Sequence, residues 1–406
     1  MRVGLLIYGS LNTVSGGYLY DRMLVDALRR RGDEVEIVSL PWRNYAQHLT
    51  DNLSIALDQR LRALNVDVLL QDELNHPSLF WINRRLRPYR YPMVAIVHHL
   101  RCSEQRPAWQ NALQREIEQI YLRNVDGFVF NSQTTAASVR RLLAHRSPAW
   151  WIGYGARAAA RAMLRRKPPA RTRLPSALDF SVVAYPAGNR FAPVLSDDDV
   201  VARAKRPGPL RLIFVGNIIP RKGLHTLIDG LAQVPRALWQ LDVVGDMNVD
   251  PAYSRQIRRR ISLFGLAGQV RLRGALSDTA LAEMLTHSHA LVVPSSYEGF
   301  GIVYLEAMGF GLPAIATTSG AAGEIITDGE DGFLAPPDDP DELARRLQLL
   351  CHDRELVIRM SLAARRRYVA HPTWQDSMAR VCRLLDRIVQ RWPVIRAEPE
   401  HHPSYV

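Results

Sequence analysis

Pro294-Ser-Ser-Tyr-Glu-Gly-Phe-Gly-Ile-Val-Tyr-Leu-Glu-Ala-Met-Gly-Phe-Gly-Leu-Pro313 is the stretch of sequence that decides the fold. The apolar run Ala290 to Val293 before it predicts a buried strand, and a helix is predicted to start near Ile302. The loop between them contains glycines and leaves free backbone N–H groups at the helix N-terminus, where a phosphate or a sugar hydroxyl is favoured. The stretch therefore indicates a parallel α/β domain with a ligand site at a strand-to-helix turn.

Apolar runs of strand type recur along the whole chain and alternate with longer segments of helical spacing, as in parallel-sheet α/β proteins. The first series of predicted strands is Val3 to Tyr8, Glu34 to Leu40, Val66 to Gln71, Met93 to His98, Gly127 to Asn131 and Val182 to Ala184. A second series is Arg211 to Gly216, Trp239 to Gly245, Val270 to Gly274, Ala290 to Pro294 and Pro313 to Thr317. Two series predict two α/β domains.

Composition sets the predicted domain limits. Residues 185 to 209 are rich in proline, glycine and aspartate, which suits a linker. We therefore predict a first domain at residues 1–188, a linker at 189–209 and a second domain at 210–373. A helix at 374–393, which can cross back to the first domain, and a flexible tail at 394–406 complete the chain.

The 406 residues are 47% hydrophobic and 23% charged, which is typical of globular proteins and sufficient for two separate cores. The first apolar run is too short for a signal-peptide core, and no run approaches the roughly 18 residues of a membrane-spanning helix. The three cysteines are odd in number and far apart, so we expect no disulfide framework and favour a reducing compartment. We expect a cytoplasmic protein.

The net charge of +12 is concentrated in one segment. Residues 149 to 181 carry seven Arg or Lys residues and one Asp, and the aromatic residues Trp150, Trp151 and Tyr154 lie at the start of this segment. We interpret this segment as a basic insertion in the first domain. It suits the headgroups of an anionic membrane, which would place the protein on the inner face of that membrane; a solvated loop is the alternative.

Two carboxylates lie in the opening stretch. Glu298 is in the loop and Glu306 is about one turn into the helix, so both can reach one ligand from different heights. The alternative is a surface carboxylate beside a helix cap. That alternative leaves unexplained why the glycines and both acids coincide at one strand-to-helix switch.

With seven residues between them, Glu298 and Glu306 match the two-glutamate signature of glycosyltransferase family 4, and the surrounding Pro-Ser, Glu-Gly-Phe-Gly and Glu-Ala-Met elements match as well. The chain therefore resembles this family, whose members have the GT-B fold of two facing Rossmann-like domains with an interdomain cleft. The resemblance implies that Glu298 binds sugar hydroxyls at the catalytic centre and that Glu306 binds the ribose of the nucleotide. It also implies that the donor lies against the backbone of four residues, Gly299, Phe300, Gly301 and Ile302.

A basic turn follows the first predicted strand of the second domain. Adjacent Arg221 and Lys222 at the carboxyl end of a strand can neutralise a diphosphate leaving group, and a solvated basic turn is the alternative. The family has a similar arrangement, which implies the diphosphate role for both residues and a donor contact at Gly216. Base selection in this fold uses backbone groups near the turn that contains Gly274, which is a further donor-binding candidate.

In the first domain, Gly16 and Gly17 follow the first strand and resemble the family's glycine pair that faces the donor phosphates; helix packing is the alternative. His98 ends a strand and aligns with the family histidine near the reacting sugar, which makes it the second catalytic candidate. His99 stands where the family usually has an acid, a departure on the acceptor side. Gln71-Asp72-Glu73 can touch an acceptor hydroxyl or form a polar loop.

We expect no metal ion. Asp197-Asp198-Asp199 contains an acid-x-acid pattern, but it lies in the predicted linker, where it suits a turn cap. His287 and His289 straddle a predicted helix end without zinc-like company. No cofactor is expected apart from the co-substrate, a UDP- or GDP-sugar.

These features predict a retaining glycosyltransferase of hexosyltransferase type. It would move a sugar from a nucleotide diphosphate sugar to an acceptor hydroxyl. The acceptor class that we consider is a lipid-linked or cell-envelope glycan precursor. One alternative is another GT-B activity on a sugar nucleotide, such as epimerisation or phosphorolysis. The other is a non-catalytic nucleic-acid- or membrane-binding module, but it leaves the paired glutamates unexplained, and we expect no nucleic-acid partner.

Overall fold

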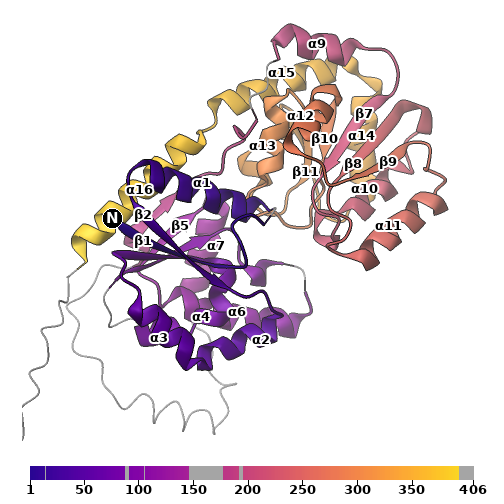
Figure 1. Ribbon diagram of the computed structural model, residues 1–406. Coiled ribbons are helices and arrows are strands. Elements are labelled where there is room, and N and C mark those ends of the chain that lie inside the picture. Colours follow the sequence, from indigo (N-terminus) through magenta and orange to yellow (C-terminus); the bar gives the residue numbers. More distant parts are fainter. Residues whose placement is uncertain (14, 87–90, 105, 146–176, 192–194, 393–406) are drawn as a thin grey trace, which may run out of the picture.

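The structure, a computed structural model, describes residues 1–392 apart from residues 14, 87–90, 105, 146–176 and 192–194. Two lobes make up this part of the chain, and each lobe has a twisted sheet between helices (Figure 1). The predicted basic insertion at about 149–181 lies outside the described residues except for its last five, and the tail at 394–406 also lies outside them.

The first lobe contains a six-stranded parallel sheet in the order β2-β1-β3-β4-β5-β6. Both faces of the sheet are buried, so that every residue of β4 is buried and apolar, as expected of a parallel sheet with helices on each side. Successive side chains of β1 enter different cores, since Leu6 belongs to one apolar cluster and Leu5 and Ile7 to the other. The strands are β1 (Arg2–Tyr8), β2 (Glu34–Leu40), β3 (Val68–Asp72), β4 (Met93–Val97), β5 (Gly127–Phe130) and β6 (Ser181–Val183).

Helices of the first lobe divide between the two faces of its sheet. Helix α1 contributes to the cluster that contains Leu5, whereas α3, α4, α6 and α7 contribute to the cluster that contains Leu6. The helices are α1 (Gly16–Arg30), α2 (Tyr45–Thr50), α3 (Ile55–Ala63), α4 (His76–Leu79), α5 (Ile82–Leu86), α6 (Ala108–Leu122) and α7 (Gln133–Ala144), with short 3₁₀ turns η1 (Asp51–Leu53), η2 (Glu73–Asn75), η3 (Arg101–Ser103) and η5 (Ala177–Phe180).

The second lobe contains another six-stranded parallel sheet, in the order β12-β11-β10-β7-β8-β9. The chain starts at the centre of the sheet, moves outward through β8 and β9, and then returns to the other side of β7 with β10. The strands are β7 (Leu210–Val215), β8 (Trp239–Val244), β9 (Val270–Gly274), β10 (Ala290–Val292), β11 (Ala314–Thr317) and β12 (Gly332–Ala335).

One apolar cluster forms the core of the second lobe and includes the fully buried Trp239 and Tyr304. The helices around it are α9 (Asp197–Lys205), α10 (Leu224–Leu231), α11 (Pro251–Leu263), α12 (Asp278–His287), α13 (Ile302–Gly309), α14 (Pro340–His352) and α15 (Arg354–Ala370), with 3₁₀ turns η6 (Pro220–Lys222), η7 (Arg236–Leu238) and η8 (Ala322–Glu324). None of the described helices in either lobe combines the length and the apolar character that crossing a membrane would require.

The predicted fold class is confirmed, because two parallel α/β sheets with helices on their faces form two Rossmann-like units. Strand β12 was not predicted. Its four residues, Gly332-Phe-Leu-Ala335, stand between two segments rich in turn residues, and so short a run shows no periodicity that marks a strand.

The predicted linker at 189–209 contains a helix, which composition did not indicate. Helix α9 is anchored to the second lobe, because buried Arg203 donates hydrogen bonds to the carbonyl oxygens of Phe310 (2.8 Å) and Gly311 (2.7 Å). Ser196 and Asp199 form a capping box at its N-terminus. The aspartates that raised the question of a metal therefore lie in the first turn of a capped helix.

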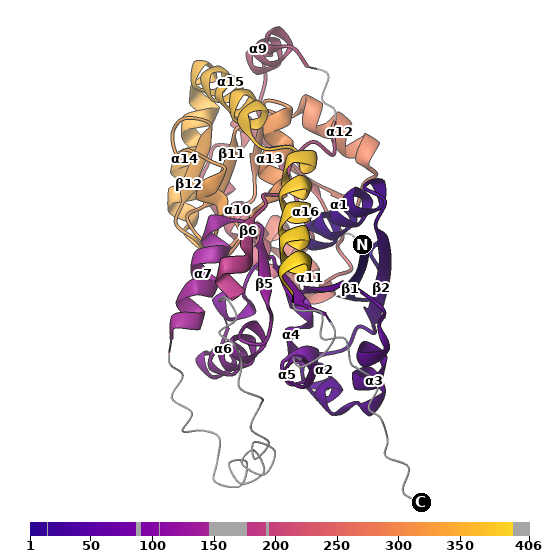
Figure 2. The same ribbon diagram turned by 90° about the vertical axis from the view of Figure 1, so that its left-hand side faces the viewer.

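Helix α16 (Trp374–Arg391) runs from the second lobe to the first, where it lies beside α1 (Figures 1 and 2). Its buried residues Val381, Leu385 and Ile388 join the apolar cluster on the α1 face of the first sheet. Arg31 reaches Asp386 at 3.0 Å. The first lobe is thus completed by a helix that comes last in the sequence.

His289 holds three parts of the second lobe together from a site that is only 1% exposed. Its Nδ1 accepts a hydrogen bond from the backbone N–H of Arg211 (2.8 Å), and its Nε2 is 3.1 Å from the carbonyl oxygen of Arg203. These contacts require a neutral ring with its proton on Nε2. Burial, with a smaller effect of Arg354, lowers the pKa of His289 to about 3.

We predict that His289 makes the protein less stable as the pH falls below 6.5. The unfolded chain takes up a proton near the ordinary pKa of 6.5, whereas the folded chain resists protonation down to about pH 3. At pH 5 this difference amounts to about 2 kcal/mol of unfolding free energy. Urea denaturation between pH 7 and pH 5 measures it: wild type should lose about that much more stability than His289→Asn.

The exposed neighbour His287 provides the control. His287→Asn should follow the pH dependence of wild type. Parallel pH profiles for wild type and His289→Asn would contradict the assignment of a neutral, buried His289.

Candidate active site

The order of the second sheet creates a switch point between β7 and β10, because the chain leaves these adjacent strands in opposite directions. Ligands of open α/β sheets bind at the carboxyl ends of such strands. Lys222 follows β7 and Glu298 follows β10, and their side chains form an ion pair although 76 positions separate them. Ser295 donates a further hydrogen bond to the Glu298 carboxylate at 2.6 Å.

Glu298 is ionised although its side chain is only 9% exposed. Burial by itself would raise its pKa, but the charges of Lys222 and Arg221 outweigh burial and hold the pKa of Glu298 at about 2. Burial also lowers the pKa of Lys222. The predicted sugar-binding carboxylate and the predicted diphosphate-binding ammonium group therefore bind each other in this state of the protein.

Arg221 lies beside this pair with 29% of its side chain exposed. One guanidinium nitrogen donates to the carbonyl oxygen of Tyr297 at 2.9 Å and lies 3.7 Å from the Glu298 carboxylate. Its other nitrogens are free of such partners among the described residues. The switch point thus holds two cations and one anion, and this net positive charge suits a diphosphate.

The segment after Glu298 approaches its surroundings so closely that side chains would not fit. A Cβ atom on Gly299 would lie 2.2 Å from the carbonyl oxygen of His98 in the other lobe. Gly301 precedes helix α13 with a φ of 96°, a backbone conformation that favours glycine. The ring of Phe300 is buried against Tyr185, so only its backbone can face a ligand.

Gly216 and Gly274 lie at the carboxyl ends of β7 and β9, the two strands on either side of β8. The Gly245 N–H donates to the carbonyl oxygen of Gly274 at 2.9 Å, and the Gly216 N–H donates to that of Val244 at 2.9 Å. A Cβ atom on Gly216 would lie 3.5 Å from the Lys222 side chain, whereas one on Gly274 would meet no described atom within 4 Å. Gly216 therefore contacts the ion pair, and the backbone at Gly274 is open to a ligand.

Glu306 is held by a residue that the sequence did not single out. Arg190 binds both carboxylate oxygens, with distances of 2.8 and 3.1 Å, and reaches Asp278 at 3.0 Å. Burial raises the pKa of Glu306 and Arg190 opposes this shift. That Glu306 binds the ribose stays a prediction, and each of its two carboxylate oxygens already accepts one hydrogen bond from Arg190.

The glycine pair of the first lobe lies against Ile302 of the second lobe and His98 of the first. A Cβ atom on Gly16 would be 3.6 Å from the Ile302 side chain, and one on Gly17 would be 3.3 Å from the His98 ring. Ser132 donates to the carbonyl oxygen of Gly299 at 3.0 Å. The structure therefore brings Gly16, Gly17 and His98 together with residues 299–302 across the two lobes.

His98 lies between the glycine pair and two carboxylates. Its Nε2 is 3.7 Å from a carboxylate oxygen of Asp21, and Asp72 is close by. Burial disfavours the charged ring, but Asp21 and Asp72 outweigh it and raise the pKa of His98. Asp21 escaped the sequence analysis because it lies inside an amphipathic helix, where a single acid gives no signal.

His99 faces the second lobe at the position where the sequence departs from the family pattern. Its Nε2 lies 2.9 Å from Glu104, which also pairs with Arg106, and its ring centroid lies 6.2 Å from that of Tyr297. His99 thus lies beside the residue next to Glu298, so the loop after β4 borders the site.

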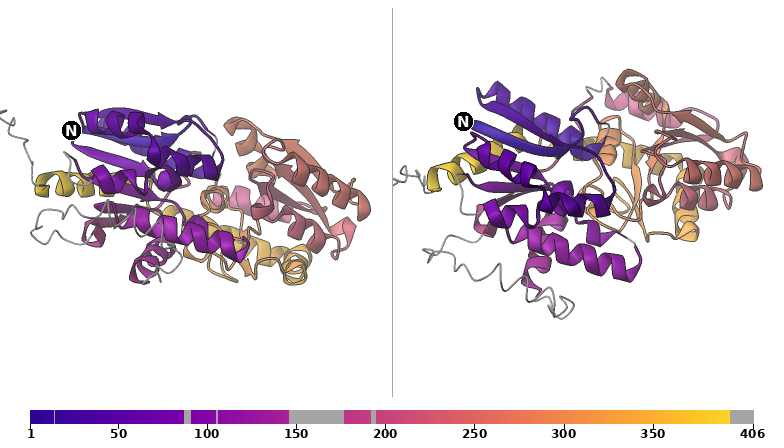
Figure 3. Two further views of the ribbon diagram at one scale, coloured as in Figure 1. Left: turned by 90° about the horizontal axis from the view of Figure 1, so that it is seen from below. Right: turned by 60° about the horizontal axis from the view of Figure 1, so that its bottom comes forward.

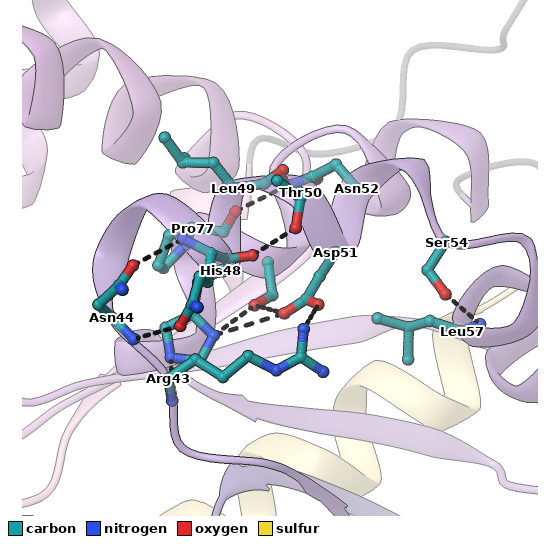
Figure 4. Close-up of polar contacts among 12 residues, drawn as sticks. Arg43, Asn44, His48, Leu49, Thr50, Asp51, Asn52, Ser54, Leu57 and Pro77 are labelled. Carbon is teal, nitrogen blue, oxygen red and sulfur yellow. Dashed lines mark hydrogen bonds and ion pairs between the residues drawn. The ribbon is translucent and has the colours of Figure 1, made fainter.

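A polar network supports the part of the first lobe near the ends of β1 and β2 (Figure 4). Asp51 accepts hydrogen bonds from Arg43 (3.0 Å) and Ser78 (2.7 Å), and His48 lies 3.4 Å from the same carboxylate. The ring of His48 stacks on Tyr8 with a centroid distance of 4.0 Å. His48 and Ser78 are buried, so we interpret the network as structural support for the loop that follows β2.

The two lobes are joined by a carboxylate that caps a helix across the interface. Glu324 of η8 accepts hydrogen bonds from the backbone N–H groups of Gln133 (2.9 Å) and Thr134 (2.6 Å) at the N-terminus of α7. A negative charge at this end of a helix also interacts favourably with the helix dipole. Figure 3 shows the lobes side by side in two further views.

Two family models match the chain. The model described as Glycosyltransferase Family 4 matches residues 19–155, and the model described as Glycosyl transferases group 1 matches residues 197–367. The second match contains the Lys222–Glu298 pair, and the first contains His98.

Curated relatives match over part of their length. A glycogen synthase from Mycobacterium tuberculosis is 32% identical over 181 residues, which cover 43% of this chain and 42% of that protein. A D-inositol 3-phosphate glycosyltransferase from Jonesia denitrificans is 30% identical over 207 residues, which cover 48% of each chain. The chain thus matches less than half the length of these relatives.

Solved structures share the fold over nearly the whole chain. Sucrose-phosphate synthase from Thermosynechococcus elongatus has a TM-score of 0.73 at 21% identity, with 96% of this chain and 99% of that chain covered. HepE from Anabaena, solved in complex with UDP and glucose, has a TM-score of 0.69 at 17% identity, with 95% and 100% covered.

We predict that Glu324→Ala separates the two lobes more often. The variant loses both interlobe hydrogen bonds and the charge at the α7 terminus, and loss of such a cap costs about 1 kcal/mol. Small-angle X-ray scattering should give a larger radius of gyration than for wild type. Exposed Glu330 lies nearby in the sequence, and Glu330→Ala is the control; a radius equal to that of wild type in both variants would refute the cap's role in closure.

Proposed function

The chain belongs to the group 1 glycosyltransferases of glycosyltransferase family 4, and from this we propose that it transfers a sugar from a nucleotide diphosphate sugar to an acceptor hydroxyl. The observation that carries the proposal is the buried Lys222–Glu298 pair at the switch point of the second sheet. A cation for the leaving diphosphate and a carboxylate for the sugar stand side by side there, as donor chemistry requires.

In the proposed reaction, Arg221 and Lys222 bind the diphosphate. The bond between the anomeric carbon and the diphosphate breaks, and the charge that develops on the leaving oxygen is stabilised by these two cations. Binding would draw Lys222 toward the diphosphate and would free lone pairs of Glu298 for sugar hydroxyls. The low pKa of Glu298 keeps it an acceptor of hydrogen bonds over the physiological pH range.

The acceptor would approach from the first lobe. Its hydroxyl oxygen forms the new bond to the anomeric carbon, and its proton passes to the departing diphosphate. We propose that the attack takes place on the face that the diphosphate leaves, so that the anomeric configuration is retained. The resemblance to family 4 supports this stereochemistry, and the contact between His98 and residues 299–302 supports an acceptor site at the lobe interface.

We propose a UDP-hexose as the donor. HepE, which shares the fold, was solved with UDP-glucose, and its TM-score to this chain is 0.69. GDP-sugars are the alternative, and calorimetric titration with UDP and with GDP distinguishes the two. The backbone at Gly274, with a φ of 72° and open space around it, is the proposed contact for the base.

A lipid-linked or cell-envelope glycan precursor is the proposed acceptor class, with the enzyme on the cytoplasmic face of an anionic membrane. The support is the charge of the segment 149–181, where basic residues outnumber acidic ones by seven to one.

We predict that Lys222→Ala and Glu298→Gln each lower the rate of sugar transfer by about 100-fold or more, since each removes a group that stabilises the transition state. Calorimetric titration with UDP separates their roles. Lys222→Ala should weaken UDP binding at least tenfold, because UDP contains the diphosphate. Glu298→Gln should leave UDP binding close to that of wild type, because UDP lacks the sugar.

Glu283→Gln, which alters an exposed carboxylate on α12, is the matched control. Unchanged transfer in both site variants would overturn the proposed site. Binding of neither UDP nor GDP, together with salt-sensitive binding to polynucleotides, would support a nucleic-acid-binding module instead. Conversion of the donor without an acceptor would indicate another GT-B activity.

Arg190 provides a further prediction, since it opposes the rise that burial causes in the pKa of Glu306. In Arg190→Ala, Glu306 loses both hydrogen bonds, its pKa rises further, and UDP binding should become about tenfold weaker at pH 6 than at pH 8. Wild type should show a smaller change, which reflects the ionisation of the terminal phosphate of UDP. Asp278→Asn alters the exposed second partner of Arg190 and should resemble wild type; a pH dependence in Arg190→Ala no larger than that of wild type would show that Glu306 does not contact the nucleotide.

A further inference from the structure

Three chemically active side chains of the first lobe converge from separate elements. Asp21 lies on α1, Asp72 ends β3, and His98 follows β4. Their carboxylate oxygens and ring nitrogen all lie within 4.8 Å of one another, and the two aspartates are at most 1% exposed. The group sits where the order of the first sheet, β2-β1-β3-β4, changes direction between β1 and β3.

Four atoms of this group lack a hydrogen-bond partner among the residues that the structure describes. They are both carboxylate oxygens of Asp21, Oδ2 of Asp72 and Nε2 of His98, and all four are buried. Only Oδ1 of Asp72 is bound, by the backbone N–H of Leu74 at 2.9 Å. Buried polar atoms of this kind nearly always have a partner, and buried carboxylates are found paired or bound to a metal.

The distance between Asp21 and His98 favours a shared ligand over a direct hydrogen bond. Nε2 of His98 lies 3.7 Å from Oδ1 of Asp21, which is longer than a hydrogen bond between nitrogen and oxygen. Two ligands of one tetrahedral metal ion, each about 2.1 Å from it, lie about 3.4 to 3.6 Å apart. The pair is therefore close to the spacing of two ligands of one ion.

A second group of the same composition lies nearby and serves as an internal comparison. Glu73, His76 and Glu118 are also two carboxylates and one imidazole, and they are buried as well. There, the protein supplies most of the partners: the Tyr45 hydroxyl lies 3.2 Å from His76, and Glu118 accepts the backbone N–H of Cys102 at 3.1 Å. Oε1 of Glu73 lacks a hydrogen bond among the described residues, but it lies 3.0 Å from Nδ1 of His76. One atom of this second group is thus left without a hydrogen bond, against four atoms of the group formed by Asp21, Asp72 and His98.

We propose that Asp21, Asp72 and His98 bind one divalent transition-metal cation, Mn²⁺ or Zn²⁺. Carboxylates suit Mn²⁺ and imidazole suits Zn²⁺, and both ions bind at sites that combine these two types of ligand. Two carboxylates balance the charge of the ion while His98 binds it as a neutral ring through Nε2. Three protein ligands leave a position for water or an acceptor hydroxyl.

The bound ion would fix His98 beside Gly17, at the point where the first lobe meets residues 299–302. A Cβ atom on Gly17 would be 3.3 Å from the His98 ring, so the orientation of this ring determines the shape of the interface. Metal binding by this group does not depend on the proposed sugar transfer, because it is measured directly on the protein.

Calorimetric titration of the full chain, stripped of metal with a chelator, tests the proposal with MnCl₂ as the probe. We expect one Mn²⁺ per chain with a dissociation constant in the micromolar range or tighter. Asp21→Asn and Asp72→Asn should each weaken binding by about 100-fold. Asp26→Asn, which alters an exposed acid on the same helix, should bind like wild type.

Two further readouts guard against variants that fail to fold and against binding elsewhere. Thermal unfolding of metal-free Asp21→Asn should remain a single cooperative transition like that of wild type, which shows that the variant folds, and Mn²⁺ should raise only the wild-type unfolding temperature. Pulsed electron paramagnetic resonance of bound Mn²⁺ should show coupling to an imidazole nitrogen, and His98→Ala should lose it. Absence of stoichiometric Mn²⁺ and Zn²⁺ binding by wild type, or equal affinity in all the aspartate variants, would overturn the proposal.

Discussion

The ion pair between Lys222 and Glu298 is the interaction on which the organisation of the site depends. It forms only because the loops after β7 and β10 touch: Gly223 has a φ of 70°, and a Cβ atom there would lie 2.0 Å from the carbonyl oxygen of Pro294. Glycine at this position lets the two backbones meet and brings a lysine and a glutamate that are 76 positions apart into contact. Since both charges are buried, losing either partner would leave the other uncompensated.

The same loop also carries the contact with the first lobe. Gly299 follows Glu298 directly and packs against the backbone of His98, and Ser132 holds its carbonyl oxygen. Helix α16 and the Glu324 cap join the lobes at two other places. A ligand that draws Lys222 away from Glu298 would therefore act on a segment that the first lobe already holds.

Sequence reasoning reached the fold class because buried parallel strands and amphipathic helices leave a periodic pattern, and the two sheets confirm it. The four-residue β12 and the helix in the predicted linker left no such pattern. The roles of Glu298, Lys222, His98 and the glycines stay predictions, although the structure brings them to one interface. The sequence did not indicate a role for Arg190, Asp21 or Glu324, because a pair of residues that are far apart in the sequence leaves no local pattern. The partner of Arg190 is 116 positions away, and those of Glu324 are about 190 positions away.

The central claim is that the pair at the switch point of the second sheet receives the diphosphate of a sugar nucleotide. A crystal structure of the protein with UDP tests it most directly. The account predicts the diphosphate within hydrogen-bond distance of the Lys222 ammonium and the Arg221 guanidinium, with the ribose beside Glu306. UDP bound elsewhere, with Lys222 and Glu298 still paired and neither cation touching a phosphate, would contradict it.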